Sequence, residues 1–97
     1  MKKILTYIFL LINISYSFGV EQIFEKANSL YHQQEFKNAI TEYNKILEKG
    51  MESTELYFNI GNCYFQLALI EESSNKQKSK DLFKISKRFY NKSLVLS

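Results

Sequence analysis

Apolar residues recur at helical spacing along most of the chain. Between Ile23 and Leu47 they fall three or four positions apart, which places them on one face of a helix. The chain has no run in which apolar and polar residues alternate strictly, as they do in half-buried strands. This pattern predicts helices over 21–33, 36–49, 53–71 and 79–95, and therefore an all-α protein.

Residues that favour helix ends stand near these boundaries. Lys49 and Gly50 combine a C-terminal cation with a glycine that suits the left-handed cap conformation. Ser53 is a candidate N-cap for the third helix, and Ser79 or Asp81 is expected to cap the last one.

The amino end has the layout of an export signal. Lys2 and Lys3 precede an apolar run over 4–14, and small or polar residues follow as far as Gly19. This layout is typical of a secretory signal peptide over 1–19, with a retained signal anchor as the alternative. Either interpretation places the rest of the chain, residues 20–97, outside the cytoplasm as one small domain.

The chain also carries an internal repeat. Residues 24–31 align with 58–65 at a distance of 34 positions, and residues 36–47 align with 83–94 at a distance of 47. The second copy is therefore longer by an insertion between its halves, which we place near 70–80.

A helix-turn-helix unit of 34 residues with small residues at fixed places resembles the tetratricopeptide repeat. The resemblance implies two such repeats after the signal segment, as a fragment of an α-solenoid. In each pair of helices, small residues would permit close approach and aromatic residues would brace the two helices. These structural repeat positions are Ala27, Phe36, Ala39, Tyr43, Gly61, Phe83, Ser86 and Tyr90.

A narrower resemblance points to the cell envelope. An export signal followed by FEKANSLY and STELYFNIGNCYF is similar to the tetratricopeptide member of the aerotolerance-operon (Bat-type) proteins. That resemblance implies an envelope or periplasmic protein that assembles with partners of the von Willebrand A-domain type.

Asn28 and Asn62 occupy equivalent places in the two copies. In the tetratricopeptide family such asparagines line the concave groove and hydrogen-bond the backbone of a bound peptide; the alternative is that both pair within the repeat or with solvent. Phe24 and Phe58 stand where the family's carboxylate-binding lysines would be, which favours an apolar ligand side chain. The resemblance implies a groove formed by Phe24, Asn28, Tyr31, Phe58, Asn62, Phe65 and Gln66, with His32 on the same face.

Composition excludes several other functions. The chain of 97 residues has one His and one Cys, too few for a histidine-based triad or a multi-cysteine zinc site. Its three glycines are isolated, so no phosphate-binding loop is present. We expect no enzyme activity, no metal and no cofactor, and we expect Cys63 to be a small core residue, with pairing between chains as the alternative.

Charge is segregated along the chain. Residues 20–72 hold nine acidic residues and four lysines, whereas residues 73–97 hold six lysines and Arg88 against Asp81. The basic part is expected to be a solvated outer face, or to dock on acidic lipid or an acidic partner; export makes nucleic acid a poor partner.

The sequence thus predicts an exported, non-catalytic scaffold that binds partner proteins of the envelope or its membrane. The last helix has more apolar residues than a single stripe needs, so something is expected to cover part of it. This excess supports the alternative of a structural subunit that self-assembles into a homo-oligomer through its exposed last helix.

Overall fold

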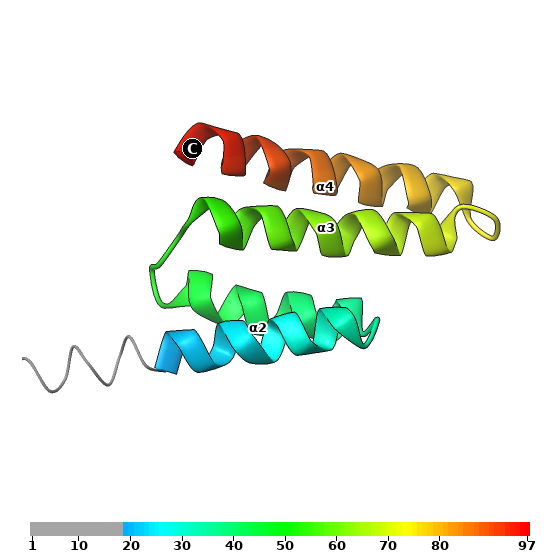
Figure 1. Cartoon of the computed structure of the whole chain (residues 1–97). Coiled ribbons are helices and arrows are strands. Elements are labelled where there is room, and N and C mark those ends of the chain that lie inside the picture. Colours follow the sequence, from blue (N-terminus) through cyan, green and yellow to red (C-terminus); the bar gives the residue numbers. More distant parts are fainter. Residues whose placement is uncertain (1–18) are drawn as a thin grey trace, which may run out of the picture.

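The computed structural model describes residues 19–97, which fold into helices joined by short turns (Figure 1). The first described helix covers 19–32 and is called the 19–32 helix below. It is followed by α2 (Phe36–Glu48), α3 (Thr54–Glu71) and α4 (Lys76–Leu96). No strand occurs in this part of the chain, so the prediction of an all-α protein is confirmed. Except for Gly19, the segment 1–19 predicted as an export signal lies outside the described residues.

The middle helices end where the sequence predicts. Ser53 caps α3, with its side-chain oxygen accepting a hydrogen bond of 3.0 Å from the backbone N–H of Leu56. Gly50 follows the end of α2 with φ of 82°, in the left-handed region where a glycine costs least.

The start of α4 differs from the prediction. The helix begins at Lys76, and its N-cap is Asn75, whose side-chain oxygen accepts from the N–H of Lys78 at 3.1 Å. Neither Ser79 nor Asp81 caps it, because both lie inside the helix. Ser79 is buried, and its hydroxyl donates to the backbone carbonyl of Ala68 instead.

The insertion of the second copy forms extra helix rather than a loop. α3 has 18 residues and α4 has 21, against 13 in α2. The expected segment 70–80 contains the end of α3, a turn over 72–75 and the beginning of α4. The added turns therefore lengthen the contact between these two helices.

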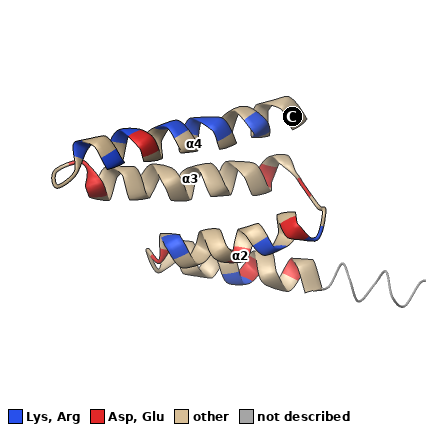
Figure 2. Cartoon of the chain, turned by 180° about the vertical axis from the view of Figure 1, so that it is seen from behind, with Lys and Arg blue, Asp and Glu red and all other residues tan. Residues whose placement is uncertain are grey.

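The core lies where the 19–32 helix, α2 and α3 meet, and α4 covers the other side of α3 (Figures 1 and 2). Its buried members are mostly aliphatic, with small residues where the helices approach closely. They are Ala27, Phe36, Ala39, Ile40, Tyr43, Ile46, Leu56, Ile60 and Cys63.

A line of small residues joins α3 to α4. Ser79, Ser86 and Ser93 are all buried and recur every seven residues, as in a coiled-coil seam. Each donates its hydroxyl proton at 2.8 Å to a backbone carbonyl of α3, which belongs to Ala68, Gly61 and Thr54 respectively. Because the residues that face each other along this line are small on both helices, α3 and α4 lie close enough for the serine side chains of α4 to reach the backbone of α3.

This close approach explains most of the apolar excess of α4. On one side of the serine line, Tyr90 packs against Phe58; on the other, Phe89 stacks on Tyr64 with ring centroids 5.6 Å apart. Because α4 packs apolar side chains against α3 on both sides of its serine line, it needs more apolar residues than a single stripe provides. Among the last residues of α4, however, Leu94 is 69% exposed and Val95 is 83% exposed.

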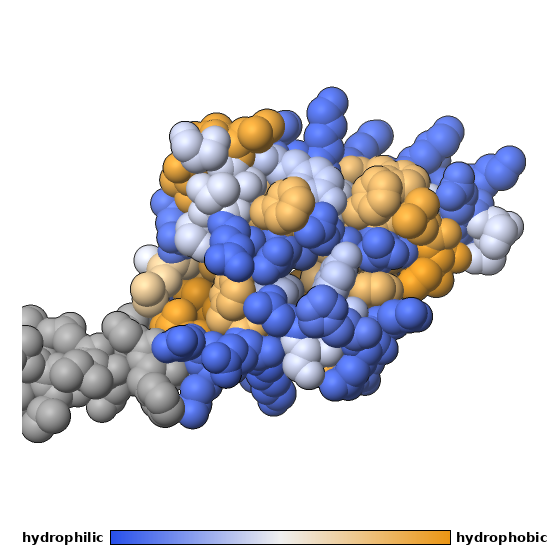
Figure 3. All heavy atoms as spheres, viewed as in Figure 1, coloured by the Kyte–Doolittle hydropathy of each residue, from blue (hydrophilic) through white to orange (hydrophobic). Residues whose placement is uncertain are grey.

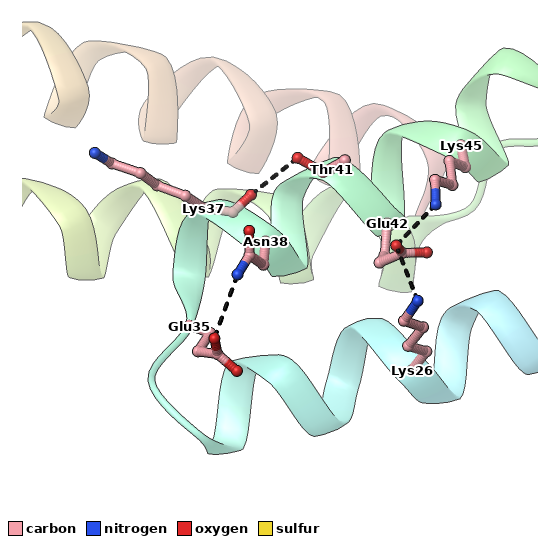
Figure 4. Close-up of polar contacts among 7 residues, drawn as sticks. All are labelled: Lys26, Glu35, Lys37, Asn38, Thr41, Glu42 and Lys45. Atoms are coloured by element: carbon pink, nitrogen blue, oxygen red, sulfur yellow. Dashed lines mark hydrogen bonds and ion pairs between the residues drawn. The ribbon is translucent and has the colours of Figure 1, made fainter.

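A carboxylate links the 19–32 helix to α2. Glu42 is buried, and its carboxylate lies 2.8 Å from the ammonium of Lys45 and 3.4 Å from that of Lys26 (Figure 4). The hydrogen bond from Lys45 is the main cause that lowers the pKa of Glu42 below its ordinary value of 4.5; burial opposes it.

Replacing Glu42 with glutamine is expected to lower the free energy of unfolding by about 1 kcal/mol at neutral pH. A carboxylate with a lowered native pKa stabilises the fold above pH 4.5, and this contribution is lost as the pH falls through the native pKa. Urea unfolding of both proteins at several pH values measures this, and the two stabilities should converge in acid. A difference that is constant with pH would contradict the charge-based account.

Candidate functional site

Two tyrosine–asparagine pairs repeat in the structure. The hydroxyl of Tyr43 on α2 donates to the side-chain oxygen of Asn28 on the 19–32 helix. In the same way, the hydroxyl of Tyr90 on α4 donates at 2.6 Å to the side-chain oxygen of Asn62 on α3. The asparagines are 34 positions apart and the tyrosines 47, the two distances at which the sequence aligns with itself.

The ring contacts repeat at the same aligned positions. In each pair of helices, two aromatic contacts flank the asparagine, with ring centroids 5.2 to 5.6 Å apart. The contacts are Phe24–Tyr43 and Tyr31–Phe36 in the first pair, and Phe58–Tyr90 and Phe65–Phe83 in the second. The two halves of the chain therefore use equivalent residues for equivalent contacts.

A cavity of about 190 Å³ opens between the 19–32 helix and α3. Its lining is polar and aromatic, and both repeated asparagines contribute to it. The lining residues are Asn28, Tyr31, His32, Tyr43, Asn59 and Asn62. Of the groove residues expected from the sequence, Asn28, Tyr31 and Asn62 are therefore brought together here.

The other predicted groove residues lie beside the cavity or beneath it. Phe58 and Phe65 are exposed on α3, one on either side of Asn62 along the helix, and Gln66 is half-buried one turn beyond Asn62. Phe24 is half-buried because its ring packs edge-on against Tyr43, so it supports the cavity wall.

Two lining residues were not predicted as groove residues. Asn59 precedes Asn62 by three positions, a spacing that places both on one face of α3 and was the available signal. Tyr43 was expected to brace the helices, and it does; its place in the cavity wall depends on how α2 packs behind the 19–32 helix.

Hydrogen bonds hold the oxygen of each asparagine amide. Tyr43 and Tyr90 engage the amide oxygens, and the Nδ2 group of Asn59 lies 3.4 Å from the oxygen of Asn28. Among the described residues, nothing accepts a hydrogen bond from the Nδ2 groups of Asn28 and Asn62. An amide nitrogen is a donor only, so each of these two lining residues keeps a hydrogen-bond donor that no described residue uses.

Burial keeps the tyrosine hydroxyls protonated. It raises the pKa of Tyr43 well above its ordinary value of 10.0, and it also raises the pKa of Tyr90. Neutral hydroxyls can donate to the asparagines at any ordinary pH, so the orientation of the two amides does not depend on pH.

Cys63 lies in the core behind this site. Its side chain is fully buried, and burial raises the pKa of the thiol to about 12. A neutral, inaccessible thiol is a poor nucleophile and a poor partner for a disulfide between chains. The residue acts as a small core side chain in the structure.

The described residues contain no candidate metal site and no helix suited to span a membrane. Within 19–97, no three residues among His, Cys, Asp and Glu are grouped so that they could hold a metal ion. None of the helices in that range combines the length and the apolar character that crossing a membrane requires.

Comparison of the chain with protein-family models, with curated protein sequences and with solved structures found no match. The class of this protein is therefore described from its own fold and cavity. Over residues 19–97 the chain is all-α: two helix pairs repeat one set of contacts, and a small polar cavity opens between the 19–32 helix and α3.

Proposed function

We propose that this protein is an exported, non-catalytic scaffold of the tetratricopeptide kind that binds a segment of a partner protein in the groove between the 19–32 helix and α3. The observation that carries the proposal is the pair of asparagines at aligned positions that line the cavity, each with its amide oxygen engaged by a tyrosine and its N–H group left as a donor. Two donors on successive helix pairs suit two backbone carbonyls of an extended peptide.

The surface beside the cavity supports an apolar component of the ligand. Phe58, Phe65 and Leu69 are 51%, 39% and 43% exposed and lie on the same side of α3 as Asn62. Exposed aromatic residues next to oriented hydrogen-bond donors are typical of binding surfaces. We therefore expect the bound segment to place an apolar side chain over Phe58 and Phe65.

The envelope setting rests on the sequence. The basic and apolar segment over 1–19 favours export, which would make the groove available to periplasmic or membrane-associated partners. We propose no cofactor and no catalytic residue, since the groups that line the cavity serve to donate and accept hydrogen bonds.

The test replaces both asparagines with aspartate. Asn28→Asp with Asn62→Asp keeps the oxygen that each tyrosine engages and removes the side-chain N–H donors. We expect capture of the partner, measured by crosslinking in intact cells, to weaken by about tenfold or more, since each lost hydrogen bond contributes about 1 kcal/mol.

The matched control introduces the same charges elsewhere. Asn38→Asp with Asn91→Asp changes two exposed asparagines on α2 and α4 that lie away from the cavity. Both double variants should keep the helical circular dichroism signal of the natural protein. Equal capture by the two double variants would refute binding in this groove.

A further inference from the structure

The outer face of α4 is a row of cations. Five basic side chains of α4 are exposed, and steps of three or four residues place them on one side of the helix. They are Lys76, Lys80, Lys84, Lys87 and Arg88. The buried serines line the side of the helix that faces α3. Figure 2 shows basic positions distributed along α4, whereas α3 carries acidic positions and no basic ones.

These charges are not neutralised within the described part of the chain. The ion pairs there join Lys26 and Lys45 to Glu42, and Lys78 to Glu71. Asp81 is the one acidic residue of α4, and it accepts a hydrogen bond from Gln77. The five outward cations therefore outnumber the single carboxylate of α4, and none of them forms an ion pair with a described residue.

The shape of this surface is that of an exposed rod. A helix of 21 residues is about 30 Å long. In Figure 3, hydrophilic side chains project from the α4 edge of the molecule, away from the rest of the chain. Such a surface meets a flat partner along its whole length, whereas it offers no enclosed site for a small anion.

Apolar side chains continue the basic face at its carboxyl end. Val95 is 83% exposed and lies in line with Lys84 and Arg88, while Leu94 is 69% exposed beside it. Exposed aliphatic residues next to lysines are the composition of helices that lie on lipid bilayers, where the chains enter the interface and the cations meet the headgroups.

We propose that the outer face of α4 binds the surface of a bilayer that contains anionic phospholipid. Charge complementarity supplies the attraction, and Leu94 and Val95 supply the apolar contact that neither a nucleic-acid backbone nor a solvated acidic peptide would use. This surface is separate from the groove, since α4 lies on the other side of α3 from the 19–32 helix. Binding of lipid and binding of a partner can therefore be tested independently.

The experiment measures co-sedimentation of the full chain with phosphatidylcholine vesicles, with and without phosphatidylglycerol. The neutral vesicles report any binding through the apolar segment 4–14, so the increase caused by phosphatidylglycerol is the quantity of interest. Each cation near an anionic surface contributes about 1 kcal/mol, or about fivefold in partitioning. Lys80→Gln with Lys84→Gln is thus expected to reduce the increase by about 25-fold.

The matched control is Lys37→Gln with Lys49→Gln, which removes the same charge from outside α4. This variant and the Asn28→Asp with Asn62→Asp variant should bind the anionic vesicles like the natural protein. Equal loss in the two lysine variants would overturn the proposal, because net charge alone would then explain binding. Salt-sensitive self-association without vesicles, or equally tight binding to a DNA duplex, would also overturn it.

Discussion

Replacing Gly61 with valine is expected to lower the free energy of unfolding by about 3 kcal/mol. A Cβ atom at this position would lie 2.7 Å from two ring carbons of Tyr90 and 3.3 Å from the backbone oxygen of Ser86. One of these contacts is with α4 backbone, so a change in the Tyr90 rotamer alone would not relieve the crowding. The seam between α3 and α4 would have to open.

Urea unfolding followed by circular dichroism measures this effect, and Leu69→Val is the control on the same helix. Leu69 is exposed, so its replacement by valine should change the free energy of unfolding by less than about 1 kcal/mol. Because small domains have only about 5–15 kcal/mol of stability, the Gly61 variant should be visibly less stable at room temperature. Equal stability of the two variants would show that the helices tolerate a wider seam.

Replacing Tyr43 with alanine is expected to cost about 4 kcal/mol of stability. The side chain is 1% exposed, packs against Phe24 with ring centroids 5.6 Å apart, and donates to Asn28. Its removal leaves a cavity between α2 and the 19–32 helix and takes away the partner that orients the Asn28 amide.

Tyr43→Phe separates packing from hydrogen bonding. It keeps the ring and removes only the hydroxyl, so the expected cost is about 1 kcal/mol. In the groove, however, Tyr43→Phe should weaken partner capture, because the Asn28 oxygen then loses its tyrosine donor and keeps only the 3.4 Å contact from Asn59. If Tyr43→Phe left capture unchanged while Asn28→Asp abolished it, orientation of the amide by the tyrosine would be refuted.

The candidate site was predictable in part, for reasons that particular residues show. Asn28 and Asn62 stand at equivalent places in a repeated sequence, and the resemblance to the tetratricopeptide repeat implied that both line one groove. Asn59 has no aligned asparagine in the first copy, where Glu25 stands, and the repeat gave no reason to select it. The predicted start of α4 at residue 79 was wrong because Ser79 is a good N-cap residue in the sequence. Nothing in the neighbouring sequence reveals that its hydroxyl donates instead to the backbone carbonyl of Ala68 on α3.

By itself, the sequence determined the helical character of the domain, most helix ends and the distances at which the chain repeats, because these depend on local spacing and on cap residues. Tertiary structure decided which groups meet. It placed the serines of α4 on the carbonyls of α3, it turned the insertion into longer helices, and it brought a tyrosine hydroxyl to the oxygen of each asparagine that lines the cavity. These outcomes depend on how closely whole helices approach one another, and that distance is set by side chains far apart in the chain.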